Sequence, residues 1–280
     1  MHSQLSSHSA EPVELANSTA ALRLDTGGPY ALLVPGYTGS KEDFAPLLDE
    51  IAGAGLSPVA IDLPGQMDTP GPADESAYLP EVLGAFVASL IATLDRPVLL
   101  LGHSYGGLVA RRAVLAGARV VGLTLLSTGP AELPTGPRRH ILDLAEALLR
   151  DQGVAAVHRG LEAMNAANPR WLAQTPQVRE FLRLRFLRNR AEALLGMGTG
   201  LRQEPDLVAD LARTLRTTNT PSLVTCGAQD DAWPPTVQRD MADRLEADFA
   251  TIESAAHSPA IENPDGLLAT LLPTWKTWLG

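Results

Sequence analysis

The sequence has few of the residues that would cross-link a secreted domain or span a membrane. Its one cysteine, Cys226, rules out an intramolecular disulfide. No stretch approaches the ~20 consecutive apolar residues that a membrane-spanning helix needs. The first residues of the chain are polar and lack the basic start and apolar run of a signal peptide. We therefore expect a cytoplasmic protein with no membrane partner.

Basic residues are also scarce. The chain has 22 Lys and Arg against 32 Asp and Glu, for a formal net charge of -10, and only Lys41 and Lys276 are lysine. This balance argues against nucleic acid as a partner, because phosphates require a basic surface. Hydrophobic residues make up 45% of the 280 residues, which is enough to bury a substantial core. The composition leaves the oligomeric state open.

Residues 1–20 are polar and irregular in pattern, and we expect either a loose lead-in or a short edge strand there. After them, short apolar runs alternate with segments of helical spacing. Continuous apolar strands separated by helices favour an α/β fold with a mostly parallel sheet and helices on both faces. The predicted strands cover residues 30–36, 57–65, 97–104, 119–128, 222–227 and 247–254. The predicted helices between them cover residues 40–55, 78–94, 105–118, 235–245 and 264–279.

The alternation stops after the fourth of these strands. Residues 131–215 contain helix candidates at 141–149, 178–195 and 207–215, and no strand candidate. We therefore expect a helical insertion there, between a first core segment at residues 1–130 and a second at residues 216–280. The glycine-rich stretch 196–200 follows a helix and lacks the Lys-Ser/Thr ending of a phosphate loop, so it predicts a break between helices.

The segment Gly102-His103-Ser104-Tyr105-Gly106 fits the pattern G-x-S-x-G between a predicted strand and a predicted helix. Such a tight turn pushes the serine hydroxyl out above the sheet edge. Side chains two residues before and two residues after the serine would collide, which explains the glycines. We therefore predict that Ser104 is a nucleophile, and that His103 points away from it and is packed and hydrogen-bonded.

A serine hydroxyl needs a base to remove its proton and an acid to orient that base. His257 follows the last predicted strand, and Asp230 follows the strand before it. Loops at the carboxyl ends of parallel strands are where sites form in such sheets. We predict His257 as the base and Asp230 as the acid, with Asp231 as the alternative. The remaining histidines lie in the lead-in or in the insertion and are weaker candidates: His2, His8, His140 and His158.

Taken together, the motifs resemble the α/β-hydrolase superfamily over residues 29–280. The matching segments are PGYTGS (35–40), DLPG (62–65), GHSYGG (102–107), GAQDDAWP (227–234) and AHSPAIENP (256–264). The resemblance implies a Ser-His-Asp triad, no cofactor, and a cap formed by the helical insertion. It also places two oxyanion-stabilising donors at the backbone N–H groups of Tyr37 and Tyr105. Many relatives have His-Gly where this chain has Pro35-Gly36, which alters the lining of the pocket.

The resemblance implies hydrolysis of a carboxylic ester, lactone or thioester of a small to medium apolar substrate through an acyl-enzyme. The same triad would also serve a carbon–carbon bond hydrolase, a cofactor-free haloperoxidase or a natural-product cyclase, and the scaffold could serve as a non-catalytic receptor. No residue cluster has metal-ligand spacing, so we predict no metal. Apolar residues of the insertion that could line a substrate pocket are Leu142, Leu149, Met164, Trp171, Phe181, Phe186 and Met197.

Overall fold

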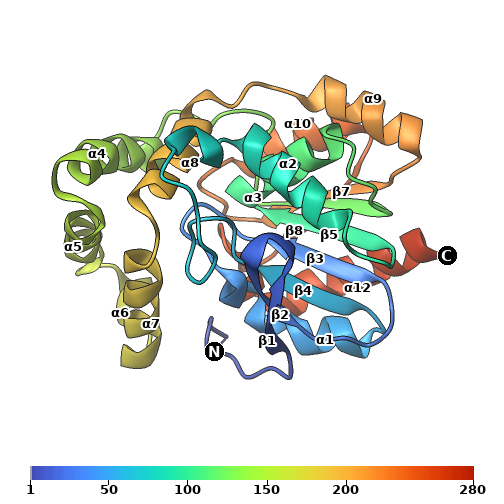
Figure 1. Ribbon diagram of the computed structural model, residues 1–280, viewed down its shortest axis with the longest axis horizontal. Coiled ribbons are helices and arrows are strands. Elements are labelled where there is room, and N and C mark those ends of the chain that lie inside the picture. Colours follow the sequence, from blue (N-terminus) through green and yellow to red (C-terminus); the bar gives the residue numbers. More distant parts are fainter. Residues whose placement is uncertain (1) are drawn as a thin grey trace.

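An eight-stranded sheet runs through the centre of the molecule, in the order β1-β2-β4-β3-β5-β6-β7-β8 (Figure 1). The structure is a computed structural model that describes residues 2–280, apart from the side chain of Arg170. The six strands from β3 to β8 are mutually parallel. The strands are β1 (Glu11–Leu15), β2 (Thr19–Arg23), β3 (Tyr30–Val34), β4 (Ser57–Ile61), β5 (Val98–His103), β6 (Gly122–Leu126), β7 (Ser222–Gly227) and β8 (Asp248–Ile252).

The predicted strands are present, and the α/β class with a mostly parallel sheet is confirmed. Of the two expectations for residues 1–20, the edge strand is confirmed and the loose lead-in is wrong in part, because β1 and β2 pair as an antiparallel hairpin at the sheet edge. β2 then pairs antiparallel with β4. β1 is difficult to recognise in the sequence because, as an edge strand, it leaves most of its side chains exposed or half-exposed.

Helices cover both faces of this sheet (Figure 1). One layer contains α2 (Pro80–Ile91), α3 (Tyr105–Leu115), α9 (Val208–Thr218) and α10 (Pro235–Leu245), and the other contains α1 (Leu48–Gly53) and α12 (Pro264–Leu279). Each layer has its own buried apolar core against the sheet. The short helical turns are η1 (Ala16–Ser18), η2 (Lys41–Leu47), η3 (Glu75–Tyr78) and α11 (Pro259–Glu262).

The predicted helix at residues 40–55 is divided into η2 and α1. Pro46 lies inside η2 and has no N–H for a helical hydrogen bond, which accounts for the tighter first part. At its start, the backbone N–H of Ser40 donates to the Asp43 carboxylate at 3.2 Å. This hydrogen bond fixes the end of the loop that follows β3.

Between β6 and β7 the chain forms a group of helices to one side of the sheet (Figure 1). We call α4 to α8 the helical insertion: α4 (Pro137–Gln152), α5 (Val154–Asn165), α6 (Pro169–Leu172), α7 (Pro176–Leu187) and α8 (Ala191–Gln203). The next helix, α9, packs against α3 and α10 in the layer that covers the sheet. The domain boundaries at residues 131 and 215 stay a prediction.

Two expectations about the insertion were wrong. The predicted helix 178–195 is interrupted between α7 and α8, and the glycine-rich stretch 196–200 lies inside α8 rather than at a break. A Cβ on Gly196 would lie 2.0 Å from the carbonyl oxygen of Glu75. A Cβ on Gly200 would lie 2.7 Å from the ring of Pro80. The glycines therefore allow α8 to approach the core closely.

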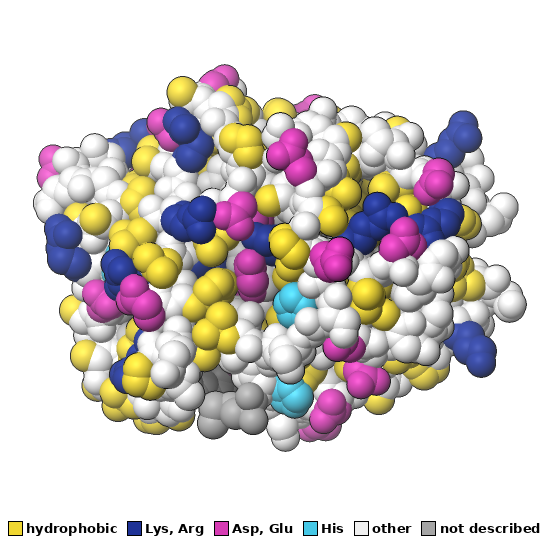
Figure 2. All heavy atoms as spheres, turned by 60° about the horizontal axis from the view of Figure 1, so that its bottom comes forward, with side chains coloured by type: hydrophobic (Ala, Val, Ile, Leu, Met, Phe, Trp, Pro, Cys, Tyr) yellow, Lys and Arg dark blue, Asp and Glu magenta, His cyan; other side chains and the backbone are white. Residues whose placement is uncertain are grey.

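Among the helices of residues 2–280, none combines the length and apolar character that crossing a bilayer demands. Acidic and basic side chains alternate over the face in Figure 2, with no large area of a single sign.

Candidate active site

Ser104 lies on the tight turn between β5 and α3, with φ 55° and ψ -118°. A positive φ is unfavourable for a serine, so the surrounding packing must hold this conformation. A Cβ on Gly102 would lie 2.2 Å from the carbonyl oxygen of Gly106, and a Cβ on Gly106 would lie 2.4 Å from that of Pro35. The steric reason for both glycines of the motif is thus present in the structure.

Two loops from the carboxyl edge of the sheet bring a histidine and an aspartate to this serine. The Nε2 atom of His257 lies 3.0 Å from the hydroxyl oxygen of Ser104. Its Nδ1 atom lies 2.9 Å from Oδ1 of Asp230. Asp231 points the other way and forms an ion pair with Arg138 at 2.7 Å, with 64% of its side chain exposed. The chain of hydrogen bonds therefore runs from Ser104 through His257 to Asp230.

The Asp230 carboxylate is buried, and both of its oxygens accept hydrogen bonds. Its Oδ1 atom also accepts from the backbone N–H of Ala232 at 2.9 Å, and its Oδ2 atom accepts from the side-chain amide of Gln238 at 3.0 Å. Burial raises the pKa of Asp230, but the hydrogen bonds from His257, Ala232 and Gln238 outweigh it and the pKa is lowered overall. The carboxylate therefore stays ionised beside His257.

The loop that carries His257 is held on both sides. The Glu262 carboxylate accepts from the backbone N–H of Ala256 at 2.7 Å and from that of Ser258 at 3.0 Å. On the opposite side, the Nε2 atom of His103 donates to the carbonyl oxygen of His257 at 2.7 Å. Burial, together with the proximity of His257, lowers the pKa of His103 to about 4. His103 is therefore neutral, and it is packed and hydrogen-bonded as the sequence predicts.

The loop after β3 lies against the nucleophile. A Cβ on Gly36 would lie 3.2 Å from the Cβ of Ser104, and the backbone N–H of Gly39 closes a turn by donating to the carbonyl of Gly36 at 3.1 Å. The side-chain amide of the buried Gln66 donates to the carbonyl oxygens of Gly36 and Tyr37. Within residues 2–280, we find no hydrogen-bond acceptor for the backbone N–H of Tyr37 or of Tyr105.

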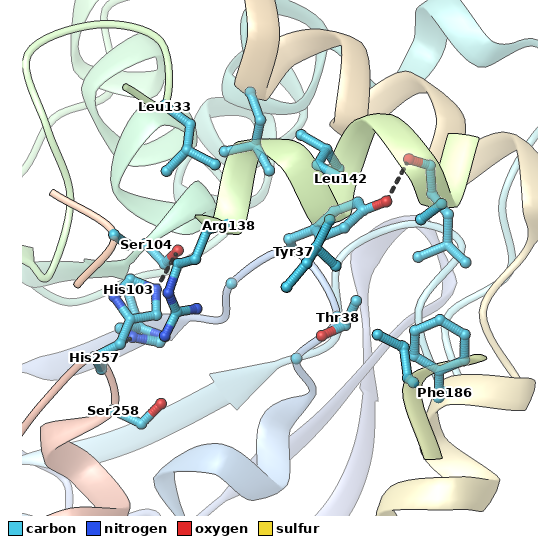
Figure 3. A pocket seen from close by; sticks show the side chains of 18 of the residues that line it. Tyr37, Thr38, His103, Ser104, Leu133, Arg138, Leu142, Phe186, His257 and Ser258 are labelled. Carbon is cyan, nitrogen blue, oxygen red and sulfur yellow. Dashed lines mark hydrogen bonds between the residues drawn. The ribbon is translucent and has the colours of Figure 1, made fainter. Parts of the chain in front are cut away.

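The side chain of Tyr37 extends into the cavity and connects this loop to the helical insertion. Its hydroxyl donates to the carbonyl oxygen of Leu194 in α8 at 2.9 Å (Figure 3). Burial holds the pKa of this hydroxyl well above its ordinary value, so it stays protonated and remains a donor. Tyr37 thereby ties the loop beside Ser104 to α8.

A cavity of about 380 Å³ opens beside Ser104 and continues beneath the helical insertion (Figure 3). Of the insertion residues suggested by the sequence, Leu142, Leu149 and Phe186 line it. Met197 is instead buried against the core, and Met164 is 57% exposed. The apolar lining of the insertion consists of Ile141, Leu142, Ala145, Leu149, Val157, Leu161, Phe186, Leu194 and Leu201.

The arginines around α7 are largely paired with acidic residues. Arg185, which lines the cavity, contacts Asp43 at 2.5 Å, and Arg188 contacts Asp68 at 2.7 Å. The Arg185–Asp43 pair is largely buried, with 14% and 17% of the two side chains exposed, whereas the Arg188–Asp68 pair lies at the surface, with 52% and 39% exposed.

Several residues that support the site had no distinctive signal in the sequence. Gln66 and Glu262 stand within or beside the motifs DLPG and AHSPAIENP, but their contacts become visible only in three dimensions. Gln238 lies one turn into α10, where its side chain reaches back to Asp230. The sequence motifs therefore identified the loops of the site, whereas the side chains that hold these loops in place could be identified only from the three-dimensional structure.

Comparison with known proteins agrees with this architecture. A pimeloyl-[acyl-carrier protein] methyl ester esterase from Xylella fastidiosa is 26% identical over 257 residues, covering 87% of this chain and 94% of that protein. A 2-succinyl-6-hydroxy-2,4-cyclohexadiene-1-carboxylate synthase from Escherichia fergusonii is 28% identical over 254 residues, covering 88% of this chain and 93% of that protein.

Solved structures share the fold at lower sequence identity. An esterase from Exiguobacterium antarcticum superposes with a TM-score of 0.75 at 16% identity, covering 95% of this chain and 99% of that one. The enol-lactonase from Burkholderia xenovorans gives a TM-score of 0.73 at 19% identity, covering 96% and 99%. The profile of the alpha/beta hydrolase family matches residues 31–270. Because this match spans most of its length, the chain belongs to the alpha/beta hydrolase family and is a hydrolase.

Proposed function

We propose that the protein cleaves a carboxylic ester, thioester or lactone through an acyl-enzyme, with Ser104 as nucleophile, His257 as base and Asp230 as acid. The observation that carries this proposal is the continuous chain of hydrogen bonds from Ser104 through His257 to Asp230 at the base of an apolar cavity. Each member has the chemical type and the distance that nucleophilic catalysis requires.

In the first step, the Ser104 hydroxyl oxygen bonds to the substrate carbonyl carbon while His257 Nε2 accepts the hydroxyl proton. The resulting tetrahedral intermediate expels the alcohol or thiol, which takes that proton from His257. A water molecule then loses its proton to His257 and attacks the acyl-enzyme. Collapse of the second intermediate returns the proton to Ser104 and releases the acid. Asp230 remains ionised throughout and stabilises the imidazolium of His257.

We propose that the backbone N–H groups of Tyr37 and Tyr105 bind the oxyanion of both intermediates. Both groups lack an acceptor within the described chain, and Gly36 lies directly against Ser104. Tyr105 is also the first residue of α3, where the helix dipole favours negative charge. Losing one such donor typically costs about 3 kcal/mol of transition-state stabilisation.

We further propose that the helical insertion serves as a cap over the site. Its side chains supply the apolar lining of the cavity, whereas the core supplies Ser104, His257 and Asp230. A cavity of about 380 Å³ lies at the small end of the range for ligand sites, which favours a small to medium substrate.

A carbon–carbon or cyclisation reaction is the second candidate. One relative of similar coverage is by its name a synthase rather than an esterase. Such a reaction would use the same Ser104, His257 and Asp230, so the bond that is broken must be tested directly.

The proposal is tested by treating the protein with a fluorescent fluorophosphonate and locating the adduct by mass spectrometry. We expect an adduct on Ser104 that is lost in the Ser104→Ala and His257→Ala variants, and hydrolysis of p-nitrophenyl esters that is lost with it. A folded protein that neither labels nor hydrolyses activated esters would contradict the proposal. Labelling without ester turnover would favour the second candidate.

A further inference from the structure

The cavity beside Ser104 continues as a long apolar arm along α4. Ile141, Leu142, Ala145 and Leu149 line it from this helix, at the spacing that places side chains on one helix face. Arg138, one turn closer to the start of α4, lies next to Ser104 and His257 (Figure 3). The twelve residues from Arg138 to Leu149 extend over roughly 16 Å of helix, so the arm is elongated rather than round.

The opposite wall of the arm is also apolar. Val157 from α5 and Leu194 from α8 are 5% and 2% exposed, and Phe186 lines the arm from α7. The hydroxyl of Tyr37 is directed at the carbonyl oxygen of Leu194 and is already used as a donor. The arm therefore offers apolar contacts along its length and favours a chain of methylene groups over a polar one.

The position of His257 decides which half of the substrate enters the arm. His257 must return its proton to the leaving oxygen or sulfur, so the leaving group lies on the side of His257. Figure 3 shows His257 and Ser258 at one end of the cavity, with Leu142 and Phe186 toward the other end. The acyl group, which points away from His257, therefore enters the apolar arm.

The charges around the cavity argue against a substrate that carries an ionised group at the far end of its acyl chain. Arg185 lines the cavity but is paired with Asp43. Arg138 is at the opposite end, beside Ser104, and is paired with Asp231. Among the described residues, Arg185 and Arg202 beside the cavity are both held in ion pairs, with Asp43 and Glu146. A carboxylate placed near Leu149 would therefore lose its water without gaining an unpaired cation, which is unfavourable.

We propose that the site takes esters or thioesters of straight-chain, medium-length fatty acids with an uncharged end, whose acyl chain lies along α4 from Ile141 to Leu149. This inference rests on the proposed acyl-enzyme function and specifies its substrate class. The leaving group lies toward Ser258 and the half-exposed Arg138, where the surface is polar.

The first test compares p-nitrophenyl esters that share one leaving group. We expect kcat/KM to be highest for the octanoate. The value for the acetate should be at least tenfold lower than for the octanoate. The value for the palmitate should also be lower than for the octanoate, because its acyl chain is too long for the cavity. The mono-p-nitrophenyl ester of suberic acid has the same chain length as the octanoate but ends in a carboxylate. We expect its kcat/KM to be at least a hundredfold lower, and an equal or higher value would overturn the proposal.

The second test narrows the arm at its far end. Leu149→Trp should lower the ratio of kcat/KM for octanoate over acetate at least tenfold, because the indole fills the space of the terminal methylenes. Leu144→Trp, on the same helix but 59% exposed and outside the cavity, is the matched control and should leave the ratio unchanged. Leu149→Ala lengthens the arm and should move the optimum to decanoate or beyond.

The two levels of the proposal fail in different ways. If the unaltered protein is not labelled by the fluorophosphonate and hydrolyses no ester, the proposed function itself is wrong. Retained labelling and acetate hydrolysis, with no preference for octanoate or with an octanoate-to-acetate ratio insensitive to Leu149→Trp, would overturn the acyl-arm assignment alone.

Discussion

The side-chain amide nitrogen of Gln66 lies 2.8 Å from the carbonyl oxygen of Gly36, and this hydrogen bond orients the peptide that carries the Tyr37 N–H. In a trans peptide the C=O and N–H groups point to opposite sides. A donor that holds the Gly36 carbonyl on one side therefore turns the Tyr37 N–H to the other. Gln66 also donates to the Tyr37 carbonyl at 3.1 Å, which fixes the next peptide as well.

We expect Gln66→Leu to lower kcat by about tenfold to a hundredfold with little change in KM. Without the amide, the two carbonyl groups lose their donor and the proposed oxyanion donor at Tyr37 loses its orientation, at a cost below the ~3 kcal/mol of deleting a donor outright. Steady-state kinetics with p-nitrophenyl octanoate would measure the effect.

The matched control for Gln66 is Thr69→Val. Thr69 is buried in the same loop, but its hydroxyl donates to the carbonyl oxygen of Asp62 rather than to the loop after β3. It should change stability and leave kcat unaltered. If both variants lower kcat equally, or if Gln66→Leu raises KM alone, Gln66 does not position the oxyanion donor.

A second prediction concerns Glu262, whose carboxylate accepts from the backbone N–H groups on both sides of His257. Glu262→Ala should lower kcat at least tenfold, because the loop is released and His257 no longer stays within 3.0 Å of Ser104. Glu262→Gln keeps one carbonyl oxygen as acceptor and should retain more activity. The rate of fluorophosphonate labelling at Ser104 should follow the same order, and unchanged labelling in the alanine variant would contradict this role.

The residues of the site that belong to local sequence motifs could be predicted, whereas those that act through contacts between distant parts of the chain could not. Ser104, Asp230 and His257 belong to motifs whose glycines, prolines and flanking strands are visible along the chain. Gln66 and Glu262 form hydrogen bonds with backbone groups. Every residue has such groups, so no particular residue type elsewhere in the sequence indicates these contacts. The same applies to Gly196, which the sequence predicts as a helix break and which instead permits a close approach to Glu75 inside α8.

The edge of the sheet shows a second limit of sequence reasoning. β3 and β5 are buried on both faces and read as continuous apolar runs, so they were predicted. β1 exposes most of its side chains and gains its conformation from pairing with β2, a tertiary contact that overrides weak local preference.

A third prediction addresses the attachment of the helical insertion to the core. The side chains of Arg111 and Glu204, only 1% and 3% exposed, form an ion pair at 3.0 Å between α3 and the residue that follows α8. Glu204→Ala leaves the Arg111 charge buried without its partner, so we expect a loss of about 3–5 kcal/mol in the free energy of unfolding. Urea denaturation would measure it.

The control for Glu204 is an exposed ion pair. Glu246 contacts Arg216 at 3.1 Å with 68% of its side chain exposed, and water and salt screen such a pair. Glu246→Ala should change the free energy of unfolding by at most ~1 kcal/mol. Similar losses in both variants would mean that burial of Arg111 does not determine the effect.

The last prediction concerns the pH dependence of stability and follows from His103. Its pKa is lowered from 6.5 to about 4 in the folded protein by burial and by its neighbour His257. Between these two values the unfolded chain binds more protons at this position than the folded chain does, so stability rises with pH. This contribution is fully present above pH 6.5 and is lost as pH falls toward 4.

The shift in the pKa of His103 limits its contribution to the free energy of unfolding to a change of about 3 kcal/mol or less between pH 7 and pH 4. In His103→Gln the side chain can still donate toward the His257 carbonyl but does not titrate, so the decline in unfolding free energy over this range should become shallower by about that amount. Asp230 does not interfere, since its lowered pKa places its own titration below 3.8. Urea denaturation of both proteins at pH 7, 5.5 and 4.5 measures the slope, and parallel curves would show that His103 is not kept neutral by the fold.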